Sequence, residues 1–191
     1  DTRTVITFAY PLNTTSILNL PQTRNQYTGE YDTVNQILFH AAHRISRLLE
    51  EKGFPSLPLM PTAAVGDLTR LKSDFSHKHS AVQCGLGQFG LNNLLITPEY
   101  GPAVRLNSVF TTADISLSPD KLFEDNLCDN CEKCINICPS GALNIHRNEL
   151  STLIGRPMDK EKCSHYMGET LNGRSCGMCL KVCLDRFDRT K

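Results

Sequence analysis

Eight cysteines crowd into the last third of this 191-residue chain, between Cys128 and Cys183. Residues 128–139 read CDNCEKCINICP, which is a C-x2-C-x2-C-x3-C-P run. Residues 176–183 read CGMCLKVC, and Cys163 precedes them by thirteen positions. This density constrains the fold more than any other feature, because the loops that carry the thiols must close around a shared partner or be joined by disulfides.

The spacing of the first run is typical of loops that bind [4Fe–4S] clusters in bacterial ferredoxins. In such a run the fourth cysteine ligates the other cluster of a pair, so the ligands of the two clusters interleave. We therefore predict two iron–sulfur clusters. Their ligands would be Cys128, Cys131, Cys134 and Cys183 for the first cluster, and Cys138, Cys163, Cys176 and Cys179 for the second.

Disulfides and zinc fit this pattern less well. The chain is long enough to bury a core without so many cross-links, and nothing in it suggests secretion. Structural zinc sites prefer two C-x2-C pairs. The ninth cysteine, Cys84, stands alone in a glycine-rich stretch, where the role of a small buried apolar residue is favoured over that of a ligand or nucleophile.

The residues ahead of the cysteines predict a mixed α+β layer. The β-branched run of residues 4–9 predicts a strand that Pro11 ends. Apolar residues at helical spacing predict an amphipathic helix over residues 32–52, with Gly53 where the helix stops. A helix of this kind is expected to pack on a sheet.

Further along, a short helix is predicted over residues 76–83, with Ser76 as its N-cap. Strands are predicted over residues 94–97 and 104–112, separated by a PEYGP turn. We expect the boundary with the cysteine-rich part near residues 116–121.

The stretch CGLGQFGLNNLLITPEYG contains a G-x-G-x-x-G at Gly85, Gly87 and Gly90. A dinucleotide-binding loop of this spelling follows a strand and opens a helix. Here a polar, helical stretch precedes Gly85, and a strand closed by Pro98 follows Gly90. We therefore reject a nucleotide loop, which leaves a tight structural connection or a backbone that approaches another bulky ligand.

Four stretches in this order, GLGQFGLNNLLITPEYGP, CDNCEKCINICPSGAL, CSHYMGET and CGMCLKVC, resemble the epoxyqueuosine reductase and reductive dehalogenase superfamily. The resemblance covers roughly residues 4–187. It implies a nitroreductase-like sheet-and-helix domain over residues 1–118 and a bacterial-ferredoxin-like double-cluster module over residues 119–191. It also implies a cobalamin-dependent reductase, in which electrons pass through both clusters to a corrinoid. The residues expected to lie against the corrinoid are then Gly85, Gly87, Gly90 and Asn92.

The chain departs from this family pattern in several places. Relatives that reduce epoxyqueuosine carry Trp and Lys where this chain has Gln88 and Leu91. Their Asp-Ser-x-Pro segment with the catalytic carboxylate is absent, and Asp67 and Asp74 are the nearest acids before the glycine loop. Twenty basic and twenty acidic residues give no basic excess, so the sequence carries no strong nucleic-acid signature and does not favour a tRNA substrate.

A reductive step needs a proton donor, and the segment DFSHKHS supplies our catalytic candidates, Asp74 and His77. His77 and His79 lie two positions apart, so on a helix only one of them can face a pocket. The competing interpretation is that both are surface histidines at a helix start. Tyr100 and Arg105 are weaker candidates, whereas His40 and His43 are interpreted as structural, and His165 and Tyr166 as packing around the second cluster.

The sequence thus favours an iron–sulfur oxidoreductase that reduces a small substrate. Its expected cofactors are two [4Fe–4S] clusters and cobalamin, and its expected electron donor is a ferredoxin- or flavodoxin-type protein. Two alternatives stay open, a ferredoxin-type electron carrier without a catalytic cofactor and a flavin-dependent reductase. No apolar run approaches the roughly 18–20 residues of a membrane span, and we expect a cytoplasmic protein. Because the chain starts at Asp1 without a methionine, it is expected to be trimmed or partial.

Overall fold

A small antiparallel sheet forms the centre of the first part of the chain. The computed structural model describes residues 1–62, 71, 73, 75–115, 126–144 and 150–187. The sheet consists of β1 (Thr4–Pro11), β5 (Val104–Thr111) and β2 (Ser56–Pro58), in the order β1-β5-β2. β1 pairs with β5 along its whole length, whereas β2 accompanies only the end of β5 from Val109 to Thr111. β1 and β5 are strands that the apolar, β-branched runs predict, whereas no strand was predicted at β2.

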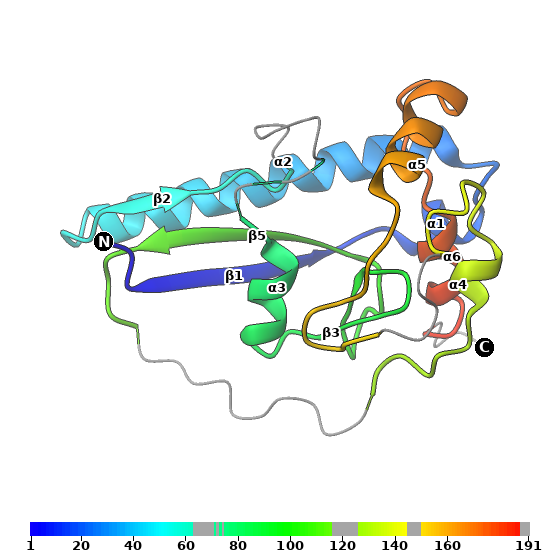
Figure 1. Cartoon of the computed structure of the whole chain (residues 1–191). Helices are drawn as coiled ribbons and strands as arrows, with labels where there is room; N and C mark the ends of the chain where they lie inside the picture. The colour runs from blue at the N-terminus through cyan, green and yellow to red at the C-terminus, as the bar shows by residue number, and fades with distance from the viewer. Residues whose placement is uncertain (63–70, 72, 74, 116–125, 145–149, 188–191) are drawn as a thin grey trace.

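Two helices cover the two faces of this sheet (Figure 1). The long helix α2 (Arg24–Glu50) lies along one face, and the short helix α3 (His77–Gln83) lies against the other. Consecutive residues of β5 show the division, because side chains alternate between the faces of a strand. Asn107 Nδ2 donates to the carbonyl of Leu38 on α2 at 3.2 Å, and Ser108 Oγ lies 2.9 Å from His77 Nδ1 on α3.

The glycine-rich stretch forms a small hairpin of its own. Strands β3 (Gln88–Phe89) and β4 (Leu95–Ile96) pair antiparallel directly after α3. The order helix, glycine loop and strand is the one predicted, and it is the reverse of the order in a dinucleotide-binding loop.

The cysteine-rich part is built from short helices at one end of the sheet layer (Figure 1). They are α4 (Lys133–Asn136), α5 (Lys160–His165), the single π-helical turn Tyr166–Thr170, and α6 (Met178–Leu184). α6 packs on α1 (Thr14–Leu18) and on α4. One buried apolar cluster therefore runs through both parts, and it consists of Leu12, Ile17, Leu20, Tyr27, Val34, Leu38, Ala103, Leu180 and Leu184.

The structure confirms a mixed arrangement of helices and a sheet, and it corrects one helix. α2 begins at Arg24, well before the predicted start at residue 32. Residues 24–31 are mostly polar, so no apolar periodicity reveals them. Tyr27 is the buried residue of this first stretch, and its ring packs on the backbone of Gly177 in the cysteine-rich part. The helix is extended by a tertiary contact that the local sequence does not encode.

The predicted boundary between residues 118 and 119 lies outside the described residues. A nitroreductase-like first domain and a ferredoxin-like second domain stay predictions. Within the residues that the structure describes, no helix has both the length and the apolar character needed to cross a membrane.

The contact of Tyr27 with Gly177 generates a stability prediction. Gly177 has φ +69°, and a Cβ there would lie 2.6 Å from Tyr27 Cε1 and 2.7 Å from Leu20 Cδ1. We expect Gly177→Ala to lower the free energy of unfolding by roughly 2–4 kcal/mol, since it combines left-handed strain with overpacking. Chemical denaturation followed by circular dichroism measures this change.

Gly173→Ala is the matched control. Gly173 has φ +78° but open space where its Cβ would be, so only the backbone strain of roughly 1–2 kcal/mol remains. Equal losses in the two variants would contradict a tight packing of Tyr27 on this loop.

Candidate redox site

The cysteines predicted to hold the first cluster come together from two segments. Cys128, Cys131 and Cys134 lie on the loop before α4 and on α4, and Cys183 lies on α6. Burial raises the pKa of Cys183 to about 12, and the next contributions come from the other three thiols. Burial also raises the pKa of Cys134 to about 11, followed by the effects of Cys128 and Cys131. Charges influence each other this way only at short range, so these four thiols are neighbours.

The second predicted set is gathered in the same way. Cys138 follows α4, Cys163 lies on α5, and Cys176 and Cys179 flank the start of α6. Burial raises the pKa of Cys163, and Cys176 and Cys138 raise it further. Burial raises the pKa of Cys179 most, followed by Cys176 and Cys163. The thiols of both sets thus lie in one part of the fold, while their division into two sets and their role as iron ligands stay predictions.

Cys138 lies in a nest of hydrogen-bond donors. Burial acts to raise its pKa, but the Ser140 hydroxyl and the backbone N–H groups of Leu143, Ser140 and Ala142 lower it overall. Ser140 Oγ lies 3.5 Å from the sulfur. Because the thiolate is the form that binds metal, this surrounding suits a ligand.

The described thiols do not form a site for a single metal ion. Within residues that the structure describes, no three His, Cys, Asp or Glu side chains converge as ligands of one metal ion. In a cubane cluster each thiolate binds a different iron, so the four sulfurs stand farther apart than the ligands of one zinc ion. The donor chemistry of the two sets fits [4Fe–4S] clusters.

A cavity of about 130 Å³ opens beside the first set. Its walls include all four cysteines of that set together with Leu91, Asn92 and Ile96 of the glycine hairpin. Two more of its residues, Asp129 and Arg186, form an ion pair of 2.7 Å and are each about two-fifths exposed.

The glycine hairpin packs directly on the first set. Leu91 and Ile96 are buried in one apolar cluster with Cys128 and Cys134. Gln88 Oε1 accepts a hydrogen bond of 2.9 Å from the backbone N–H of Leu127, the residue before Cys128. The hairpin thus positions the start of the cysteine loop, and Gln88 and Leu91 are among the residues that do so.

Contacts within the chain account for the three glycines. Gly85 has φ +72° directly after α3. A Cβ on Gly87 would overlap the carbonyl oxygen of Ile96, and one on Gly90 would lie 2.5 Å from Ile96 Cδ1. The tight hairpin therefore requires glycine without any ligand, and a contact of these residues or of Asn92 with a corrinoid stays a prediction.

His77, one of the two catalytic candidates, is held by both ring nitrogens. Nδ1 lies 2.9 Å from Ser108 Oγ, and Nε2 lies 2.9 Å from the carbonyl oxygen of Met60, which can only accept. This assigns the proton of a neutral ring to Nε2. Burial lowers the pKa of His77, the Met60 carbonyl raises it, and Arg105 lowers it. The role of His77 as an acid stays a prediction, and Asp74 lies outside the described residues.

A polar cluster that the sequence analysis missed surrounds Arg105. Arg105 Nη2 donates to Tyr31 Oη at 3.2 Å and to Thr62 Oγ1 at 2.7 Å, and its Nε donates to Asn35 Oδ1 at 3.1 Å. Its guanidinium also lies 4.1 Å from the centre of the Tyr31 ring. The signal in the sequence was the pair Tyr31 and Asn35, two polar residues one helical turn apart.

Helix α2 connects this cluster with the second set of cysteines. Arg24 near the start of α2 donates to the carbonyl oxygen of Cys176, and Tyr31 lies two turns further along the same helix. Burial raises the pKa of Tyr27, while Arg105 lowers it and Cys179 raises it. Burial lowers the pKa of Lys78, followed by Lys160 and Arg105, whereas Cys179 raises it.

A separate hollow of about 350 Å³ lies beside Gly85, and Tyr100 and Val104 also line it. Val104 and Arg105 are consecutive residues of β5, so their side chains point to opposite faces of the sheet. Tyr100 and Arg105, the two weaker candidates, therefore do not belong to one site.

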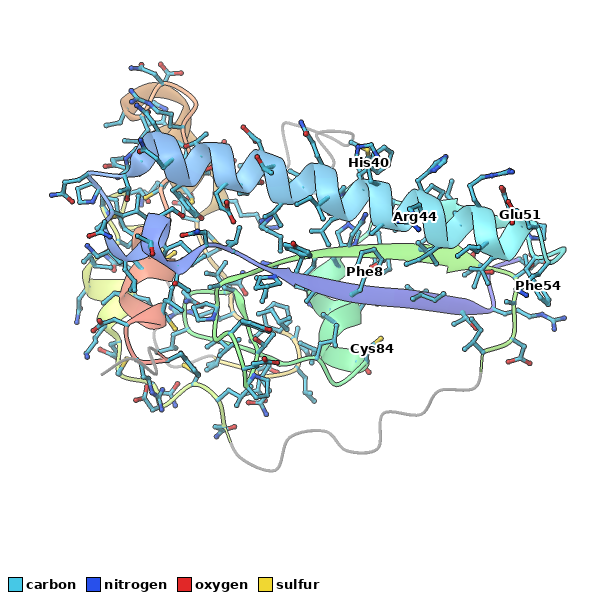
Figure 2. All side chains as sticks on the ribbon, turned by 180° about the vertical axis from the view of Figure 1, so that it is seen from behind. Phe8, His40, Arg44, Glu51, Phe54 and Cys84 are labelled. Atoms are coloured by element: carbon cyan, nitrogen blue, oxygen red, sulfur yellow. The ribbon has the colours of Figure 1, made fainter. Side chains whose placement is uncertain are left out.

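The prediction that Cys84 is buried is wrong. Cys84 is the C-cap of α3 and is exposed at the end of that helix (Figure 2). Cys84 lies at the end of α3, where its side chain points to solvent. The buried apolar residues that follow it in the sequence belong to the β3–β4 hairpin. His40 is exposed on α2, and its interpretation as a structural residue stays a prediction.

Comparisons with known proteins agree with the motif order. The chain is 38% identical to a tetrachloroethene reductive dehalogenase of Sulfurospirillum multivorans, over 54% of this chain and 22% of that protein. It is 35% identical to an epoxyqueuosine reductase of Bacillus cereus, over 51% of this chain and 22% of that protein. A crystal structure of epoxyqueuosine reductase with an epoxyqueuosine-modified tRNA-Tyr stem loop matches with a TM-score of 0.53 at 17% identity. That match covers 94% of this chain and 47% of the other.

These matches confirm the predicted resemblance to the superfamily, whose named relatives here are reductases. The chain spans about a fifth of the length of the curated relatives it matches. No protein-family profile matches it.

The surroundings of His77 generate a prediction about pH. Its pKa in the folded chain is below the unfolded value of 6.5, so folding disfavours its protonated form. The stability that the neutral ring contributes is present above pH 6.5 and is lost as the pH falls toward the folded pKa. We expect the parent protein to lose more stability than His77→Gln between pH 7 and pH 5, measured by urea denaturation at each pH. Parallel losses in the two proteins would rule out this coupling.

Proposed function

We propose that this relative of the epoxyqueuosine reductases and reductive dehalogenases is part of an iron–sulfur reductase. Electrons would pass from an external ferredoxin- or flavodoxin-type donor through two [4Fe–4S] clusters to a corrinoid, for the reduction of a small substrate. The observation that supports this proposal is the gathering of thiols from separate segments: Cys128, Cys131, Cys134 and Cys183 line one cavity, and Cys138 and Cys179 pack against the same apolar cluster as Cys128 and Cys134. A single-ion site or a set of surface cysteines would not need that arrangement.

The exposure of the thiols supports a direction for the electrons. Cys131 of the first set is exposed, so a donor protein can approach the first cluster. Cys179 of the second set packs against the apolar cluster that contains Cys134 of the first, so the two sets are adjacent. Cys176 of the second set accepts a hydrogen bond from Arg24 on α2, the helix that also carries Tyr31. The polar cluster is then the proposed end of the path.

The donor set of this cluster also fits a corrinoid. Arg105, the Tyr31 hydroxyl and the Asn35 amide can donate hydrogen bonds, and they would bind the amide carbonyls at the rim of a corrin and the phosphate of its tail. When bound, a corrinoid supplies a low-valent cobalt centre that donates electrons to a substrate. Absorbance spectra of anaerobic protein titrated with cobalamin or flavin distinguish three cases. A corrinoid enzyme binds cobalamin, a flavin enzyme binds flavin, and a simple electron carrier binds neither.

The chain's own residues would handle the proton. Reduction of a substrate by two electrons requires a proton, and Tyr31 Oη is positioned to hold it. The guanidinium of Arg105 donates to this oxygen and lies 4.1 Å from the centre of the ring, so it holds the hydroxyl in a fixed position. His77 and Asp74 remain alternative donors from the sequence.

The ligand assignment predicts the iron and sulfide content of the protein. After anaerobic reconstitution we expect about eight irons and eight sulfides per chain. Cys183→Ser should lower both to about four, because it removes a ligand of the first set alone. Iron and sulfide analysis measures this, with Cys84→Ser as the control that keeps the full content. Loss of iron in Cys84→Ser, or full content in Cys183→Ser, would contradict the ligand assignment.

The assignment of Tyr31 as proton donor predicts the effect of removing its hydroxyl. Tyr31→Phe keeps the ring beneath Arg105 but removes the hydroxyl, so substrate reduction should slow about 100-fold or more while iron content stays unchanged. The assay follows oxidation of reduced methyl viologen with tetrachloroethene or an epoxyqueuosine-modified stem loop, the substrates in the relatives' names.

Tyr100→Phe is the matched control, since Tyr100 is exposed and lies at the hollow on the other face of the sheet. A Tyr31→Phe protein that turns over at the parent rate would remove Tyr31 from the mechanism.

A further inference from the structure

Asn92 is the polar residue of the glycine hairpin that faces the first set of cysteines. It is only 4% exposed and lines the cavity of about 130 Å³ together with all four of those cysteines. Its Oδ1 accepts a hydrogen bond of 3.1 Å from the backbone N–H of Leu94. This bond fixes the orientation of the amide, so the Nδ2 end is the one left to interact elsewhere.

The Nδ2 atom is buried and has no hydrogen-bond partner of normal length among the described residues. An unsatisfied buried donor costs about 1–3 kcal/mol, so folded proteins retain one only where something else compensates. Asn92 and Cys183 line the same cavity, whose other walls include the remaining three thiols of the first set. The partner chemistry available to the buried Nδ2 is therefore a cysteine sulfur.

We propose that Asn92 Nδ2 donates a hydrogen bond to the Cys183 thiolate of the first cluster and raises the reduction potential of that cluster. This assigns Asn92 a partner different from the corrinoid contact implied by the family resemblance. It rests on the proposed function, because it requires the first cluster to be bound.

The physical reason lies in the charge of the cluster. Reduction adds one electron, from [4Fe–4S]²⁺ to [4Fe–4S]⁺, and the charge on the sulfurs becomes more negative. A fixed N–H donor stabilises the reduced form more than the oxidised form, and hydrogen bonds to the sulfurs are among the determinants of cluster potential. Asn92 is a positioning and tuning residue in this proposal, without contact to substrate.

Two variants remove the donor in different ways. Asn92→Ser keeps an oxygen that can accept from Leu94 N–H, but its hydroxyl is too short to replace the amide. Asn92→Asp keeps the shape and the acceptor, and replaces the donor with a negative charge. At the parent's midpoint potential we expect the ratio of reduced to oxidised first cluster to fall about three- to tenfold in Asn92→Ser, and further in Asn92→Asp. A tenfold change corresponds to about 59 mV for a one-electron couple.

The measurement is a dithionite titration of the reconstituted protein, followed by electron paramagnetic resonance, which resolves the two reduced clusters. Asn93→Asp is the matched control. Asn93 is the next residue, but its Oδ1 accepts from the backbone N–H of Arg156 at 3.4 Å, so its side chain serves a different contact. This variant makes the same chemical change without removing the proposed donor, and we expect a clearly smaller shift.

The outcomes are distinguishable. A parent and variants with full iron content but unchanged potentials would overturn the role of Asn92 and leave the two-cluster reductase intact. An equal shift in Asn93→Asp would also overturn it, because general charge would then explain the effect. A parent protein without the first cluster would overturn both. Circular dichroism of each variant identifies any that fails to fold, and Asn92→Ser serves if Asn92→Asp does not fold.

Discussion

The docking of the start of α2 onto the loop around Cys176 is the contact on which the rest of the structure depends. Arg24 Nη1 donates to the carbonyls of Ser175 at 2.9 Å and Cys176 at 2.6 Å. Tyr27 packs on Gly177, and Lys181 Nζ donates to the carbonyl of Leu20. These bonds hold the cysteine-rich loops against the sheet layer, so that one continuous core supports both.

This docking explains why the redox groups lie where they do. The long helix that carries Tyr27 at its start also carries Tyr31 and Asn35 one and two turns further on. The same element therefore fixes the second set of cysteines and presents the partners of Arg105. Rigid elements of this kind place polar groups more precisely than loops do.

The glycine hairpin plays the corresponding part for the first set. Its glycines let β3 and β4 fold tightly around Ile96, which places Leu91 against Cys128 and Cys134 and turns Asn92 toward Cys183. The G-x-G-x-x-G spelling thus belongs to a structural hairpin. The hairpin packs on the cysteine loop. This contact explains why the glycine motif accompanies the cysteine motifs, even if the hairpin itself binds no ligand.

Much of this could be predicted where the information is local. The apolar runs located β1 and β5, and Ser76 was identified as the cap of α3. The division of the cysteines into two groups of four stays a prediction. The early start of α2, the exposure of Cys84 and the cluster around Arg105 could not be read in this way. Each of these three features depends on contacts with residues far away in the sequence. The periodicity of apolar residues carries no information about such contacts.

By itself, the sequence determined the class of donor chemistry and the elements of the fold, because thiol spacing and apolar patterning act over a few residues. Only the tertiary structure decided that Tyr31 meets Arg105, that Asn92 faces Cys183, and that Gly85 and Arg105 lie toward opposite faces of the sheet. The reason is that such contacts join segments far apart in the chain, and their geometry is set by packing.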